Sequence, residues 1–91
     1  KGKVKNIYDF GDKRGEIMEI EILPTSKFAD KKILELNLSQ GILIGAVLRG
    51  KEVFFPEDDF ILQINDKLIL FTDSQSIKEV EKFSEVNIEF F

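Results

Sequence analysis

The apolar stretch ILIGAVL at residues 42–48, together with the turn and short strand predicted directly after it, decides the fold. Both alternating sets of positions in this stretch are uncharged, which predicts a central strand covered on both faces. The sequence RGK at 49–51 then predicts a tight turn, and VFF at 53–55 predicts a second strand that ends at Pro56. The centre of the chain is therefore predicted to be a β-hairpin.

Two segments before the hairpin carry the periods of regular elements. Residues 16–22 alternate acidic with apolar side chains, which predicts a strand with one solvated face that ends before Pro24. Apolar residues then recur at roughly helical spacing, so residues 29–38 are predicted to form a helix, with Asp30 as a candidate cap. Residues 1–14 are predicted to be a lead-in strand or linker, which leaves residues 15–91 as the domain proper.

After the hairpin, residues 60–64 and 67–71 read as two strands joined by a turn at Asn65-Asp66. The Asp66 side chain is predicted to shape that turn through its own hydrogen bond. Ser76 followed by Glu79 is a capping-box pattern, which predicts the start of a second helix. The apolar stripe of that helix is expected at Ile77, Val80 and Phe83, and a last strand is expected from the alternation of Val86, Ile88 and Phe90.

The order of these segments predicts an α+β fold, with a small, mainly antiparallel sheet of about four strands and two helices. A chain of 91 residues is the length of a single domain, and its 43% hydrophobic and 33% charged residues are an ordinary globular balance. Because the sequence does not begin like a natural amino terminus, we expect it to be a piece of a longer polypeptide.

Composition excludes several classes of function. The net charge is −4, so the chain has no basic field for nucleic acid or anionic membranes. It contains no cysteine and no histidine, which removes thiolate chemistry, cysteine metal sites and the commonest general base. The longest apolar run has seven residues and is too short to insert into a membrane. An enzyme is therefore not expected.

The succession of elements over residues 16–83 resembles the TrkA carboxy-terminal domain, also called the RCK carboxy-terminal domain. The resemblance rests on the helix sequence KKILELNL at 31–38, the apolar strand closing on Arg49-Gly50, the motif VFFP at 53–56 and the turn at Asn65-Asp66. The family often has glycine where this chain has Asp30 and Asn65. Both replacements tolerate unusual backbone angles or cap helices, so the fold is expected to survive them.

The resemblance implies a cytoplasmic, ligand-sensing regulator that dimerises and lies peripheral to a membrane transporter of the Trk or Ktr potassium type. Such domains follow a nucleotide-binding domain, and some bind cyclic di-AMP at the dimer interface. Expected partners are therefore a second copy, the preceding nucleotide-binding domain and a membrane potassium transporter or channel subunit, with neither nucleic acid nor direct membrane insertion. No Gly-x-Gly-x-x-Gly motif occurs here, so no cofactor is expected in this domain itself.

Four residues are candidates for ligand binding: Ile44, Arg49, Phe55 and Pro56. Arg49 could offer a planar donor fork to a phosphate or carboxylate, and the alternative is a solvated or surface-paired side chain. The aromatic residues before Pro56 could form a wall against a base, and the alternative places at least one of them in the core.

The candidate dimer interface comprises Ile42, Leu43, Ile44 and Val47, because seven consecutive uncharged residues are hard to cover in so small a monomer. The acidic run EDD at 57–59 lacks the spacing of a calcium loop and is interpreted as solvated, so no metal is expected. Two rival functions remain: a purely structural dimerisation domain, and the regulatory domain of another cation antiporter or anion transporter.

Overall fold

The structure is a computed structural model that describes the backbone of residues 2–9 and 14–84. Five strands form one sheet: β1 (Gly2–Asp9), β2 (Gly15–Ile22), β3 (Ile42–Arg49), β4 (Glu52–Phe54) and β5 (Lys67–Asp73). Their order across the sheet is β1-β2-β5-β3-β4, and every neighbouring pair is antiparallel. The predicted α+β fold with a mainly antiparallel sheet is confirmed, and the segment predicted as a lead-in strand or linker contains β1.

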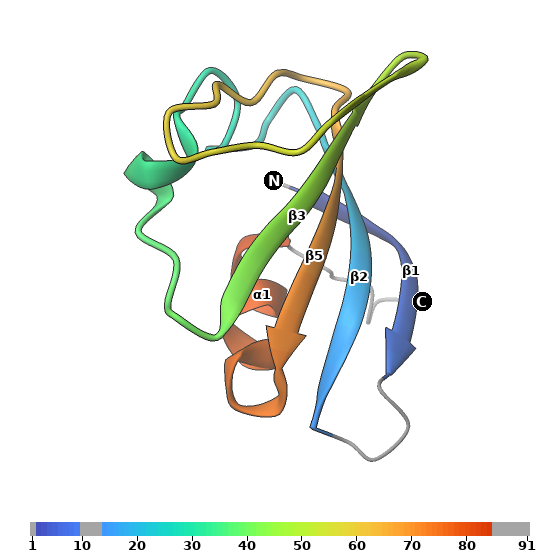
Figure 1. Ribbon diagram of the computed structural model, residues 1–91, viewed down its shortest axis with the longest axis vertical. Helices are drawn as coiled ribbons and strands as arrows, with labels where there is room; N and C mark the ends of the chain where they lie inside the picture. Colours follow the sequence, from blue (N-terminus) through green and yellow to red (C-terminus); the bar gives the residue numbers. More distant parts are fainter. Residues whose placement is uncertain (1, 10–13, 85–91) are drawn as a thin grey trace.

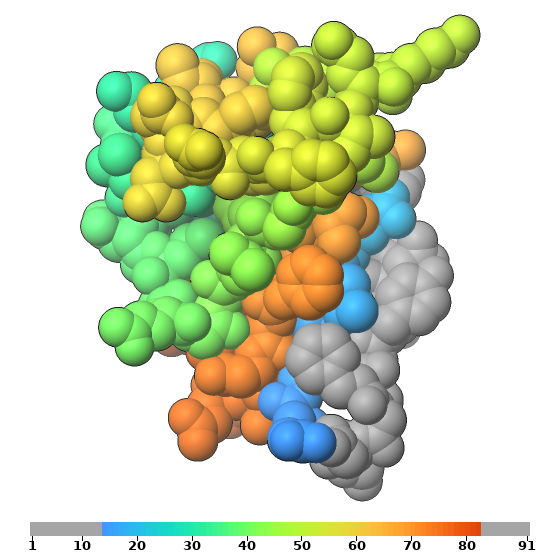
Figure 2. Space-filling model, in the orientation of Figure 1, coloured from blue at the N-terminus to red at the C-terminus, as the bar shows by residue number. Residues whose placement is uncertain are grey.

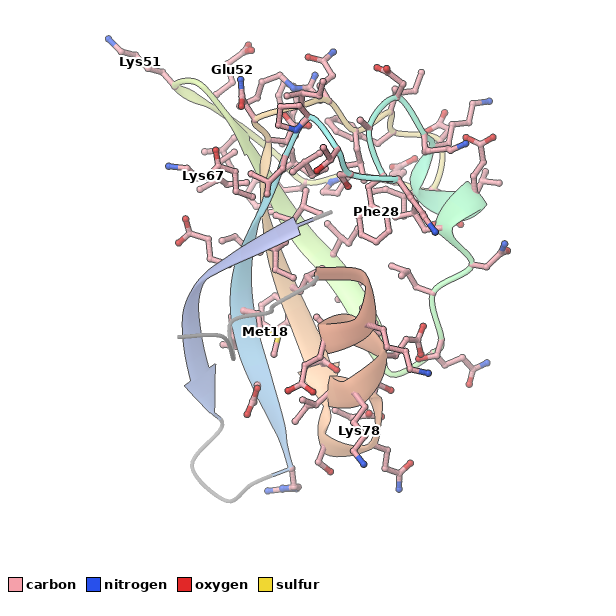
Figure 3. All side chains as sticks on the ribbon, turned by 180° about the vertical axis from the view of Figure 1, so that it is seen from behind. Met18, Phe28, Lys51, Glu52, Lys67 and Lys78 are labelled. Atoms are coloured by element: carbon pink, nitrogen blue, oxygen red, sulfur yellow. The ribbon has the colours of Figure 1, made fainter. Side chains whose placement is uncertain are left out.

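One helix, α1 (Ile77–Ser84), packs against one face of the sheet, and the opposite face is turned toward the viewer in Figure 1. Figure 3 shows the covered face from behind, with Met18 between the sheet and the helix. Apolar side chains of β2, β3 and β5 meet Val80 of α1 in a single core. The core residues are Met18, Ile20, Ile22, Phe28, Ile42, Ile44, Val47, Leu62, Leu68, Leu70 and Val80.

Residues 23–38 and 55–66 form what we call the loop layer, which lies beside one end of the sheet (Figure 1). The two halves of this layer bond to each other through their backbones. Asp30 N donates to Leu62 O at 2.7 Å, and Leu62 N donates to Lys31 O at 2.9 Å. A second pair of bonds runs from Ile33 N to Phe60 O and from Leu34 N to Asp58 O.

The prediction of a helix over residues 29–38 is wrong. Only a short 3-10 turn, η1 (Ile33–Leu36), forms there. Asp30 and Asn37 on either side of it have φ values of 63° and 51°, and a helix cannot continue through left-handed backbone. Asp30 therefore caps no helix; its backbone N–H serves the loop layer instead.

The predicted strand over residues 60–64 is also absent from the described chain, where a single bridge joins Ile61 to Lys32. Its backbone groups pair with the loop at 30–34, so they are not available to the sheet. The predicted second helix is confirmed as α1, which comes directly after the 3-10 turn η2 (Ser74–Ser76). The predicted final strand at 86–90 lies outside the described residues.

The start of α1 is capped differently from the predicted capping box. The Asp73 carboxylate accepts a hydrogen bond from Ser76 N at 2.9 Å. Glu79 instead accepts from Ser39 N at 3.3 Å, and so ties the helix to the segment that enters β3. Both carboxylates lie near the positive end of the helix, where a negative charge is favoured.

Candidate functional site

Arg49, at the end of β3, forms a two-pronged ion pair with Asp66, the residue before β5. Arg49 Nε donates to Asp66 Oδ1 and Nη2 donates to Oδ2, both at 2.8 Å. The Asp66 side chain is 1% exposed and also accepts from Gln63 N at 2.8 Å. Asp66 thus shapes its turn, as predicted, but it also carries a long-range ion pair that no sequence pattern indicated.

Two aromatic rings hold the Arg49 guanidinium in place. Its central carbon lies 5.2 Å from the centroid of Phe54 and 5.1 Å from that of Phe60, within the range of cation–π attraction. The two rings themselves are 5.2 Å apart. A further bond from Arg49 Nη2 reaches Ile61 O at 3.1 Å. We call Arg49, Phe54, Phe60 and Asp66 the arginine clasp; it fastens the loop layer to the β3–β4 hairpin.

The arginine clasp also changes the pKa of the Arg49 guanidinium. The hydrogen bond to Asp66 is the main cause of the raised pKa of Arg49; burial, the next largest effect, lowers it, and the charges of Asp66 and Glu52 raise it. A cation whose folded-state pKa is raised stabilises the fold at every pH below its unfolded pKa. The contribution of Arg49 is therefore constant through the neutral range and is lost in strong alkali.

A hollow of about 370 Å³ lies between the first half of β3 and the loop layer. Its apolar lining comes from β3 and from both halves of that layer: Ile33, Leu34, Leu38, Ile42, Leu43, Ile44 and Pro56. The polar lining comprises Asn37, Glu57 and Asp58. More of the exposed lining is polar than apolar, so the hollow differs from the mostly apolar pockets that bind drug-like small molecules.

The sheet face opposite α1 carries exposed apolar side chains, and Figure 2 looks onto it. Leu43 of β3 is 63% exposed, and its cross-strand partner Phe71 of β5 is 38% exposed. A Cβ atom added to Gly45 would stand 2.5 Å from the Phe71 ring, so glycine is needed for the ring to lie across β3. Ile17 and Ile69 are half-buried on the same face. These residues, Ile17, Leu43, Ile69 and Phe71, form what we call the outer patch.

The structure brings two of the four predicted ligand residues together. Ile44 and Pro56 line the hollow, although the Ile44 side chain is largely buried. Arg49 does not line it, because its Nε and Nη2 donors serve Asp66 and Ile61. Phe55 points into solvent with 80% exposure.

Of the four predicted interface residues, three are buried and one is exposed. Ile42, Ile44 and Val47 place their side chains in the core, where they are at most 7% exposed, and Leu43 turns outward. A partner on this strand would therefore meet the Leu43 side chain and the backbone of its neighbours. Leu34, Asn37 and Phe71 are candidate contacts that the sequence did not indicate.

Within residues 2–9 and 14–84, no cluster of acidic side chains could hold a metal ion. No helix among those residues is long and apolar enough to cross a membrane. The site consists instead of a hollow with a mixed polar and apolar lining and an apolar sheet face, which share one strand. These features define a small α+β module with an open hollow and an exposed apolar sheet face.

Comparison with known proteins identifies the module. Residues 17–84 match the TrkA-C domain, and the chain belongs to that family. Three relatives carry the name Trk system potassium uptake protein TrkA. The one from Azorhizobium caulinodans is 33% identical over the whole chain, the one from Halomonas elongata 34% over the whole chain, and the one from Haemophilus influenzae 35% over 90% of it. The chain spans about a fifth of the length of each.

Proposed function

We propose that this chain is a ligand-sensing, dimerising regulatory domain of a potassium-transport system. The match to the TrkA-C family and the names of the relatives support a role in potassium uptake over a role in another cation antiporter or anion transporter. Because those relatives are about five times longer, a nucleotide-binding domain and a membrane transporter subunit are the proposed partners. The proposed location is cytoplasmic, at the face of that transporter.

A single residue carries the proposal. Leu43 lines the hollow beside β3 and also stands on the outer patch. Any ligand in the hollow and any second copy on the patch would contact the same stretch of β3. A ligand can therefore favour one dimer geometry by binding it more tightly, with a coupling of about 1–3 kcal/mol. In this scheme the domain transmits binding and performs no chemistry.

Dimerisation is proposed to bury the outer patch. Replacing Leu43 with lysine puts a charge at the centre of the apolar contact, and burying an unpaired charge is costly. We expect the dimer of the parent domain to dissociate at least about tenfold more readily in the variant, measured by light scattering across micromolar concentrations.

The matched control is Ile64→Lys, which introduces the same charge at a 43%-exposed residue in the turn before β5. That variant should keep the parent mass. A parent domain that is monomeric at tens of micromolar, or equal masses for both variants, would contradict dimerisation through the outer patch.

The ligand is tested by isothermal titration with cyclic di-AMP, with ATP, NADH and potassium chloride as controls. One cyclic di-AMP per dimer, with weaker binding after Pro56→Ala, would support a sensor that uses the hollow. Binding that weakens on Arg49→Ala without loss of fold would mean that the nucleotide phosphate draws Arg49 away from Asp66.

A purely structural dimerisation domain is the second candidate function. The walls of the hollow favour it over an anion sensor, because Glu57 and Asp58 would repel a phosphate and the described lining carries no basic side chain. A stable dimer that binds none of the four titrants would support this candidate. Sensing would then reside elsewhere in the longer protein.

A further inference from the structure

We propose that the open edge of β3 accepts an extended, lysine- or arginine-bearing segment of another polypeptide as an additional strand. The proposal goes beyond dimerisation and rests on the proposed function only in its choice of partner. A strand seated there would fill the hollow beside β3, so the segment and a small ligand would exclude each other.

The first observation is that β3 is only half covered on one side. Its neighbour β5 pairs with Ile42–Leu48, whereas β4 on the other side pairs only with Val47–Arg49. In the described chain, no strand pairs with residues 42–46 on the side away from β5. An unpaired strand edge is a template for another chain.

The second observation is the direction of the backbone groups. Asp73 N donates to Gly41 O, so the Gly41 carbonyl faces β5, and Ile42 N donates to Ser39 O on the other side. Because successive residues of an antiparallel strand alternate, the N–H and C=O of Ile44 also face away from β5. An added strand would bond there, as in the β-augmentation of peptide-binding domains.

The third observation is the chemistry beside this edge. Leu34 is 53% exposed and stands with Leu38 and Pro56 around the hollow, so an aliphatic stem can lie among them. Glu57 and Asp58 are exposed on the same walls and would face a cationic head at the end of that stem. Lysine and arginine combine such a stem with such a head.

Charge complementarity selects a basic segment over a second copy of this chain. The chain has a net charge of −4, and edge-to-edge pairing would bring two acidic hollows toward one another. Cytoplasmic loops of membrane proteins carry an excess of lysine and arginine, so a transporter partner would offer segments of the required kind. The hollow, at about 370 Å³, has room for one such side chain.

The probe is the acetylated and amidated heptapeptide Val-Lys-Val-Lys-Val-Lys-Val, compared with its Val-Glu counterpart. A third peptide carries N-methyl groups on alternate backbone amides, which removes donors from one edge without changing charge. We expect the lysine peptide to bind at least about tenfold more tightly than either of the others. Bound peptide should also slow amide hydrogen exchange at Ile44 by at least about tenfold.

Two neighbouring carboxylates supply the matched variants. Asp58→Lys reverses a charge that lines the hollow, whereas Asp59→Lys makes the same change to an exposed residue that does not. We expect only Asp58→Lys to lose the lysine peptide, by at least about tenfold, while near-identical spectra show that both variants fold.

The proposal would be overturned by no saturable binding of the lysine peptide, by equal binding of the lysine and glutamate peptides, or by equal loss in the two variants. Equal binding of the N-methylated peptide, or protection of Ile44 by dimerisation alone, would also overturn it. Dimer mass is recorded separately, so a failure of the proposed dimer is distinguishable from a failure of strand docking.

Discussion

The variant Arg49→Met is expected to lose about 3 kcal/mol of unfolding free energy, a large share of the roughly 5–15 kcal/mol that holds a small domain together. Methionine keeps much of the packing against Phe54 and Phe60 but supplies no donor. Asp66, which is 1% exposed, would retain only the hydrogen bond from Gln63 N. The cost arises more from leaving the buried Asp66 carboxylate without its cationic partner than from losing the attraction between Arg49 and Asp66.

Urea denaturation measures the loss as a lower midpoint with an unchanged slope. The control is Lys51→Met, which removes an exposed cation at the tip of the hairpin, where Figure 3 shows Lys51 extending away from the body of the domain. Its effect should stay within about 0.5 kcal/mol.

The double variant Arg49→Met/Asp66→Asn completes the test. Asparagine is uncharged and needs no cationic partner. The double variant should therefore lose less unfolding free energy than the sum of the two single losses. Additive losses would mean that Arg49 and Asp66 act independently, and the arginine clasp would then have no energetic basis.

Leu62→Ala is expected to destabilise the domain by about 2–5 kcal/mol. Leu62 belongs to the loop layer yet is completely buried, and its backbone bonds to Asp30 and Lys31 prevent the loop from closing over the lost volume. The variant should therefore leave a cavity beneath the layer.

The adjacent Ile61 provides the comparison, because it is 49% exposed and Ile61→Ala removes a similar volume from the surface. That variant should cost less than about 1 kcal/mol by the same thermal or urea measurement. Equal costs at the two positions would show that the loop layer does not rest on the core through Leu62.

The local pattern of apolar and polar residues was sufficient to predict the strands of the sheet and the helix that packs on it. The alternation at 16–22, the apolar run at 42–48 and the turn at Gly50 predicted β2, β3 and the hairpin, and all three form. The prediction that residues 42–48 are a central strand covered on both faces is wrong, because β5 is the central strand and Leu43 on the outer face of β3 is 63% exposed. The apolar stripe that begins at Ile77 likewise predicted α1.

The loop layer could not be read in the same way, because its order comes from two segments about thirty residues apart. Helical spacing at 29–38 is real, but Asp30 and Asn37 adopt left-handed backbone and the N–H groups between them serve Phe60 and Asp58. A pattern of side chains does not reveal which distant carbonyls are available, so tertiary bonding decided the conformation.

Contacts between distant residues also decide the candidate site, and the local pattern could not predict them. The sequence singled out Arg49 but not its partner, since seventeen residues separate Arg49 from Asp66. The signal becomes readable only when the β3–β5 register is known: Leu48 pairs with Lys67, which places Arg49 and Asp66 side by side. Leu43 was selected for its place in an uncharged run, and the structure adds that it alone of the four predicted interface side chains is exposed.

The position of β5 has a consequence for how the domain forms. This strand is the last of the five in the chain but the central one in the sheet, between β2 and β3. Until residues 67–73 have been synthesised, β3 lacks its main partner and β2 can pair only with β1, and pairings between distant segments are slow to form. During translation, residues 1–66 therefore emerge before the central strand, and we expect cooperative folding only once β5 has left the ribosome.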